Sequence, residues 1–166
     1  MSENENVGAA HAAPQQQFGI QRIYTKDISF ETPNTPTIFT TKWEPEMNVE
    51  INSTATLIQE GLYEVVLRLT ITAKVAEQTA YLVEVKQAGI FNVSGFDESG
   101  LGHMLHSFCP NILFPYGREV VSDLVTRGSF PQMLLAPVNF DAIYAQHLQQ
   151  RAKQAEAEAG AAPSIH

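Results

Sequence analysis

The hydrophobic period of the chain changes once, from two in the first half to that of a helix in the second. Over residues 63–75 every odd position is apolar, and the even positions are polar except for Val66. The same alternation recurs over residues 79–87 and 47–52. Near the start, residues 20–31 alternate in the same way, with Ile20, Tyr24, Ile28 and Phe30 on one side. A period of two indicates strands with one buried and one solvated face.

Short polar links join the last three predicted strands, which favours an antiparallel meander, whereas the longer, proline-containing link after the first strand suits a crossover loop. Residues 115–127 have a helical apolar face and end at Gly128. Asn139 is suited to cap a last helix with apolar positions from Phe140 to Leu148. The pattern predicts an α+β fold: a four-stranded antiparallel sheet with helices packed on one face.

Two helices cover only one face of such a sheet. An apolar side chain left in water forfeits roughly 1.5 to 3 kcal/mol, so we expect a second subunit to cover what the helices do not. This predicts a homodimer or a tetramer.

Length and composition indicate one folded domain, over residues 18–150, between a disordered N-terminal tail (1–17) and a flexible C-terminal tail (151–166). No signal sequence or membrane-spanning run is present, and the single cysteine fits a reducing compartment, so we expect a cytoplasmic location without membrane insertion. The net charge is −8, and residues 27–84 hold nine acids against three bases. This excess disfavours nucleic acid and leaves two readings, a solvated surface or a docking face for a basic partner.

Candidate chemistry is sparse. The chain has no nucleotide-binding or hydrolase motif, and Gly100 and Gly102 are interpreted as a loop. His103, His106 and Cys109 are the best metal candidates, but no fourth ligand stands nearby. Cys109 as a nucleophile would need a base, and its neighbours favour a buried thiol. We therefore expect no enzyme activity, no metal and no cofactor.

Aromatic residues remain, in the crossover loop and on or beside the helices. They either form core or line a groove that binds extended apolar chain.

Four stretches carry a family resemblance: IQRIYTKDISFETPN, LYEVVLRLTITA, CPNILFPYGREVVSDLVTRGSFPQ and LAPVNFDAIYAQHLQQ. They resemble the SecB family of bacterial export chaperones over about residues 18–150. The resemblance implies a homotetramer, a dimer of dimers, that keeps unfolded precursor proteins translocation-competent and delivers them to the ATPase SecA. The alternative is an adaptor that binds one folded partner through the acidic face.

The resemblance also implies site residues. SecA would bind an acidic sheet surface at the matching positions Asp27, Glu31, Leu82 and Glu84. Unfolded clients would bind an aromatic groove at Trp43, Tyr116 and Tyr144, with Ile90 as an apolar neighbour. The oligomer interface would include Val83, Val85 and Gln87.

Overall fold

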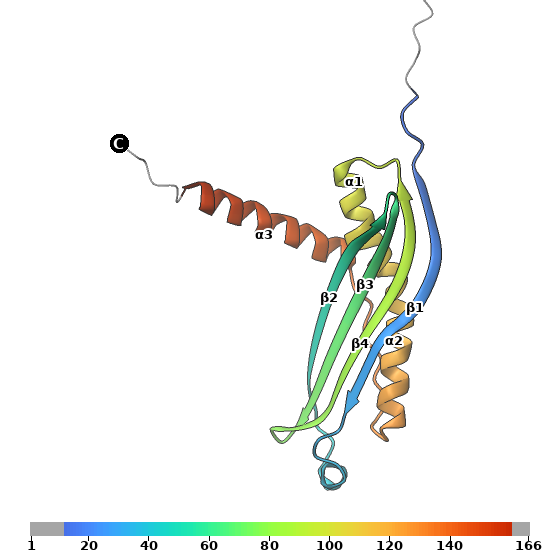
Figure 1. Ribbon diagram of the computed structural model, residues 1–166. Helices are drawn as coiled ribbons and strands as arrows, with labels where there is room; N and C mark the ends of the chain where they lie inside the picture. Colours follow the sequence, from blue (N-terminus) through green and yellow to red (C-terminus); the bar gives the residue numbers. More distant parts are fainter. Residues whose placement is uncertain (1–11, 161–166) are drawn as a thin grey trace, which may run out of the picture.

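A single antiparallel sheet organises the computed structural model, which describes residues 12–160 (Figure 1). The spatial order of its strands is β1-β4-β3-β2, so the last three strands form the predicted meander. Most of the predicted N-terminal tail and the last six residues lie outside the described residues. The strands are β1 (Gln17–Glu31), β2 (Glu46–Gln59), β3 (Leu62–Val75) and β4 (Gln78–Ser94).

The predicted alternation is confirmed in β3 and β4. The odd side chains from Val65 to Val75 are buried, and those between them are half-buried or exposed. β4 continues seven residues beyond the predicted end at Gln87, to Ser94. Gly89 lies in this extension and is required by packing, because a Cβ there would lie 2.6 Å from the Phe91 ring. We call the side of the sheet that carries the odd residues of β3 the covered face, and its other side the open face.

Two register shifts in β1 correct the predicted side-chain orientation. They fall between Ile20 and Arg22 and between Thr25 and Asp27, where one residue is left without a partner on β4. Each such bulge moves the following residues to the other face. Tyr24 therefore pairs with Ala88 on the open face, while Ile20, Ile28 and Phe30 pair with odd residues of β4 on the covered face.

The covering helix begins earlier than predicted. It consists of α1 (Glu98–His103), a π-helical turn η2 (Met104–Phe108) and α2 (Cys109–Arg127). Gly100 and Gly102 are therefore helical, and the loop interpretation is wrong. The prediction that the helix starts at Pro115 is also wrong, because Pro115 lies inside α2.

Local hydrogen bonds explain this start and the course of the helix. The Asp97 carboxylate caps α1 by accepting from the Gly100 N–H at 2.7 Å. In η2, the Cys109 N–H donates to the Met104 carbonyl, five residues back. The helix ends as predicted at Gly128, whose N–H donates to the Leu124 carbonyl at 3.0 Å.

Close packing joins α2 to β3 and β4. A Cβ at Gly117 would lie 2.9 Å from Leu69 and 3.5 Å from Gln87, so the helix approaches the sheet closely at this glycine. Leu113, Val121 and Val125 of α2 are fully buried. The predicted α+β class, with helix packed on one face of the sheet, is confirmed.

α3 (Phe140–Gly160) follows an irregular link and projects away from the sheet (Figure 1). The Asn139 side chain caps it as predicted, accepting from the Ala142 N–H at 3.0 Å. Phe140 is its one buried residue. The helix continues to Gly160, so residues 151–160 of the predicted C-terminal tail are helical. Within residues 12–160 no helix combines the length and the hydropathy that crossing a membrane would require.

Candidate functional site

Four rings form an aromatic cluster where the crossover loop meets the end of α2. Trp43 stacks on Tyr81 with ring centroids 6.3 Å apart and lies 5.7 Å from Phe130. Phe39, in the 3-10 turn η1 (Thr37–Thr40), lies 5.2 Å from Phe130 and is 50% exposed. Tyr81 and Phe130 are buried and Trp43 is half-buried. The cluster therefore has a packed base and an accessible rim.

An apolar strip follows the edge strand β2 away from this cluster. Met47 and Val49 are 40% and 41% exposed, and Ile51 is half-buried. Their partners Ala73, Ile71 and Leu69 are buried, so the strip lies on the covered face. It stays open because α2 packs mainly on β4 and β3, and the covering helix contacts β2 mainly through η2.

A pocket of about 150 Å³ begins where the strip ends. Ile51 and Ser53 of β2 line one side, and His106 and Tyr144 line the helical side. The His106 ring stacks on Tyr144, with centroids 6.0 Å apart and planes 16° apart. Burial, followed by the charge of Arg151, lowers the pKa of His106, which favours the neutral and less hydrated ring. The pocket is therefore suited to an apolar or aromatic group.

The predicted aromatic residues are only partly brought together. Trp43 and Tyr144 lie at the two ends of the apolar strip. Tyr116 is 47% exposed on α2 and has no ring contact with either of them in the described chain. The placement of Ile90 beside these rings is wrong, because it pairs with Arg22 and Glu64 on the open face. Sequence reasoning missed Met47 and Val49 as exposed groups, although their alternation was visible.

The predicted SecA-binding residues share the open face. Glu31 lies opposite Leu82, and Asp27 lies opposite Lys86. Glu84 lies between Leu82 and Lys86 on the same face of β4. The second β1 bulge reverses the effect of the first, so Asp27 and Glu31 reach the same side as Leu82 and Glu84, as simple alternation from Ile20 would place them. The pairing of β1 with β4 thus places all four residues on one surface.

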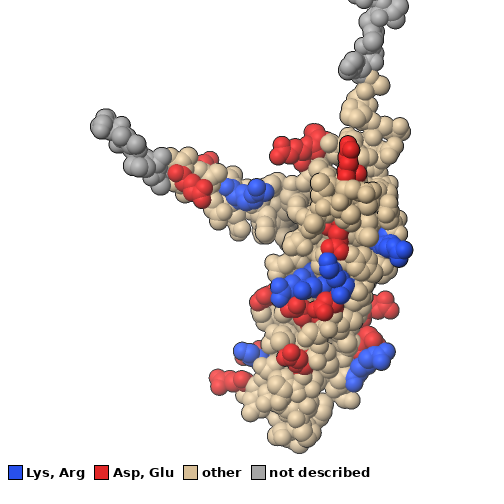
Figure 2. All heavy atoms as spheres, viewed as in Figure 1, with Lys and Arg blue, Asp and Glu red and all other residues tan. Residues whose placement is uncertain are grey.

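The charge of this surface is mixed rather than uniformly acidic. Glu84 pairs with Arg68 at 2.6 Å, and Lys26 pairs with Glu64 at 2.6 Å. Basic and acidic side chains lie next to one another over the middle of the sheet, on the side that faces away from α2 (Figure 2). The acidic excess along the sequence therefore overstates the acidity of this face.

Tyr24 and Glu64 are coupled on the same face. The Tyr24 hydroxyl donates to the Glu64 carboxylate, and partial burial followed by this contact raises the pKa of Tyr24 to about 12. The hydrogen bonds from Lys26 and then Tyr24 lower the pKa of Glu64. Glu64 is thereby held ionised beside its two donors.

The predicted oligomer-interface residues are buried within the protomer. Val83 and Val85 are completely buried, and the Gln87 side chain donates to the Tyr24 carbonyl at 3.0 Å beneath α2. Direct contact of these side chains with a partner subunit is excluded in this conformation, because α2 covers them. Any effect on assembly has to act through the packing of α2, and that effect stays a prediction.

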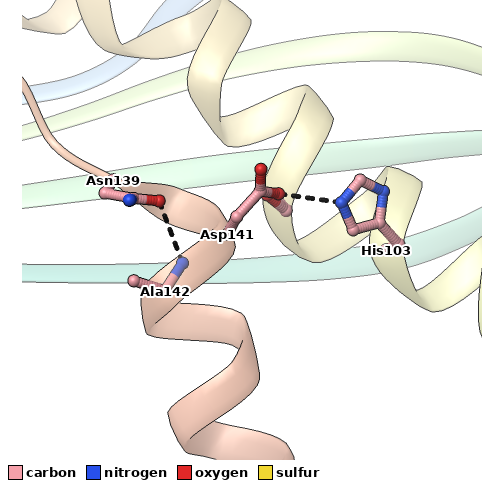
Figure 3. A network of polar contacts seen from close by, with 5 residues as sticks. His103, Asn139, Asp141 and Ala142 are labelled. Carbon is pink, nitrogen blue, oxygen red and sulfur yellow. Dashed lines mark hydrogen bonds and ion pairs between the residues drawn. The ribbon is translucent and has the colours of Figure 1, made fainter.

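The histidines and the cysteine of the metal candidate point to different surroundings. Cys109 is buried in the core, and burial raises its pKa to about 12, which disfavours the thiolate. His103 instead contacts Asp141 of α3, with Nε2 2.8 Å from Oδ1 (Figure 3). Among residues 12–160 no three His, Cys, Asp or Glu side chains converge in a way that could hold a metal.

A sheet with one helix-covered face and an accessible apolar strip beside an aromatic cluster is typical of proteins that bind other polypeptides. The sequence profile described as "Preprotein translocase subunit SecB" matches residues 11–151. The chain belongs to the SecB family and is a protein-export chaperone rather than an enzyme.

Relatives agree with this assignment, and a solved structure shares the fold. The "Protein-export protein SecB" of Methylococcus capsulatus is 59% identical over 86% of this chain and 92% of its own. That of Nitrosococcus oceani is 55% identical over 94% and 96%. A SecB-like chaperone of Mycobacterium tuberculosis, solved in complex with a peptide from the HigA1 antitoxin, has the same fold. Its TM-score is 0.61 at 16% identity, over 73% of this chain and 90% of that chain.

Proposed function

We propose that the protein keeps unfolded precursor proteins translocation-competent by binding their apolar segments along the covered face beside α2. The binding surface would run from the aromatic cluster through Met47 and Val49 to the Tyr144 pocket. The observation that carries this proposal is the exposure of Met47 and Val49 on the covered face, next to the buried residues Ala73 and Ile71 of β3. The mycobacterial SecB-like chaperone, solved with a bound peptide, supports a polypeptide ligand for this fold.

The chemistry of the surface suits a ligand without defined sequence. Flat rings and aliphatic side chains bury apolar groups without directional demands. β2 lies at the edge of the sheet and hydrogen-bonds only to β3 within the described chain, so its outer main-chain groups are free to pair with an extended client. Micromolar binding corresponds to a net of about 8 kcal/mol, which a few buried client side chains can supply.

Delivery to SecA would use the open face. Asp27, Glu31, Leu82 and Glu84 lie there together, on the opposite side of the sheet from the proposed client surface. A client and SecA could therefore be bound at the same time. Because Arg68 and Lys86 lie among the acids, the face is complementary to a partner that carries charges of both signs around an apolar contact for Leu82.

Assembly as a homotetramer would cover further apolar surface. Phe18, Ile20 and Ile28 of the edge strand β1 are 37%, 48% and 47% exposed on the covered face, where the helix covers them only in part. A second copy of the chain packed against them would remove this surface from water. Several client surfaces on one particle would then add avidity.

We place this chaperone in the cytoplasm.

Titration with several unrelated, reduced and carboxymethylated proteins tests the proposal. A chaperone binds most of these permanently unfolded chains and does not bind their native forms. Binding to none of them, together with binding to one folded partner, would establish the adaptor function instead. Native mass spectrometry of the same samples reports the assembly state and the number of clients on each particle.

A further inference from the structure

Tyr144 lies against the backbone of α1 at a glycine. A Cβ built on Gly102 would lie 2.5 Å from the Tyr144 hydroxyl oxygen, whereas the next ring atom, Cζ, would be 3.6 Å away. The first distance is a collision and the second is ordinary van der Waals contact. Glycine is the poorest helix former apart from proline, so its presence within α1 calls for a reason. The space that the hydroxyl occupies provides one.

Two histidines hold the ring on either side of this contact. His106 stacks on Tyr144 nearly in parallel, and His103 approaches it edge-on, with centroids 6.1 Å apart and planes 67° apart. Residues three apart on a helix point to the same side, which brings both imidazoles to α3. The ring of Tyr144 is thus enclosed by Gly102, His103 and His106.

Asp141, three residues before Tyr144 on α3, ties the same turn to the same helix. Its carboxylate contacts His103 at 2.8 Å and accepts from the Ser107 hydroxyl. Figure 3 shows this contact next to the Asn139 cap at the start of α3. The start of α3 is held by this group of contacts together with the packing of Phe140 and Ile143 against the core.

We propose that Gly102, His103 and His106 are positioning residues that fix Tyr144, and with it the start of α3, at the end of the apolar strip. This inference rests on the proposed client surface, of which Tyr144 forms one end. The specific requirement is the absence of a side chain at position 102 when a hydroxyl is present at position 144. Removal of the hydroxyl should therefore remove the requirement.

A double-mutant cycle tests this coupling in the full-length protein. The variants are Gly102→Ala, Tyr144→Phe, their combination, and Gly160→Ala as a matched control with no atom within 4 Å of the added Cβ. Hydrogen exchange of the peptide over residues 140–148 reports the docking of α3. The affinity for a reduced, carboxymethylated protein reports client binding.

Gly102→Ala should accelerate exchange over residues 140–148 and weaken client binding by roughly fivefold, as overpacking does. Gly160→Ala should stay near the wild type in both measurements. Tyr144→Phe should keep the exchange rate of the wild type, and the double variant should match Tyr144→Phe in both exchange and affinity. Since alanine favours the helix, a weaker α1 cannot explain the loss. Wild-type behaviour of Gly102→Ala, or no recovery in the double variant, would overturn the inference.

Tyr144→Ala separates this inference from the proposed function. If it binds the unfolded protein as tightly as the wild type, the client role of Tyr144 is refuted. In that case the exchange rates of Gly102→Ala and of the double variant still decide whether Gly102 positions Tyr144.

Discussion

Replacement of Trp43 by alanine is the most direct test of the client surface. Trp43 is half-buried against Tyr81 and Phe130, so one part of its ring supports the fold and the other part is available to a client. The two parts predict two separate losses, one in stability and one in affinity.

Both losses can be sized from the structure. Truncation of a fully buried large aromatic residue costs about 3–5 kcal/mol, so half-burial gives about 2 kcal/mol of stability, which a typical domain tolerates. If about 100 Å² of the ring is open to a client, its burial contributes about 2.5 kcal/mol at about 25 cal/mol per Å². Neighbouring rings retain part of that contact. We therefore expect about 1–2 kcal/mol, or roughly 5- to 30-fold weaker binding.

The anisotropy of a fluorescently labelled, reduced and carboxymethylated protein measures this affinity. Trp43 is the single tryptophan of the chain, so its own emission should also change when the wild type binds a client without tryptophan. Trp43→Phe keeps a ring in the cluster and should retain most of the affinity. Urea unfolding of each variant reports the stability loss independently.

A Trp43→Ala protein that remains folded and binds the unfolded client with wild-type affinity would refute the reasoning. The aromatic cluster would then serve only to pack the crossover loop against the end of α2. The client surface would have to lie elsewhere on the molecule.

Three further predictions concern the open face and the core. Glu84→Lys reverses a charge and breaks the ion pair with Arg68, so it should weaken SecA binding in surface plasmon resonance and leave client binding unchanged; equal losses in both would contradict separate surfaces. Cys109 should resist thiol reagents at neutral pH until the protein unfolds, since its pKa is about 12; rapid labelling of the folded protein would contradict its burial. Contacts with Lys26 and Tyr24 lower the pKa of Glu64, so the unfolded state takes up the proton first as the pH falls below about 4.5. The stability that Glu64 contributes is present above that pH and is lost as the pH falls through its folded-state pKa. Urea unfolding at a series of pH values should therefore show a shallower acid loss for Glu64→Gln, and an unchanged profile would disprove the coupling.

The local pattern in the sequence was enough to predict the sheet and its covered face. Alternation in β3 and β4 records which side chains are buried, because a strand that is solvated on one face must change polarity at every residue. The meander, the crossover loop, the Asn139 cap and the stop at Gly128 are likewise local, since each depends on a few neighbouring residues. The family could be recognised for the same reason, from contiguous stretches.

Tertiary structure decided the features that depend on a distant partner. The bulges that turn Tyr24 to the open face arise from the pairing with β4, and the ion pairs that offset the acids arise between neighbouring strands. The helix runs through Pro115 because packing against the sheet outweighs one lost hydrogen bond. Met47 and Val49 are exposed because α2 packs mainly on β4 and β3. The need for glycine at position 102 follows from Tyr144, 42 residues away along the chain, whose hydroxyl occupies the space that any side chain there would fill.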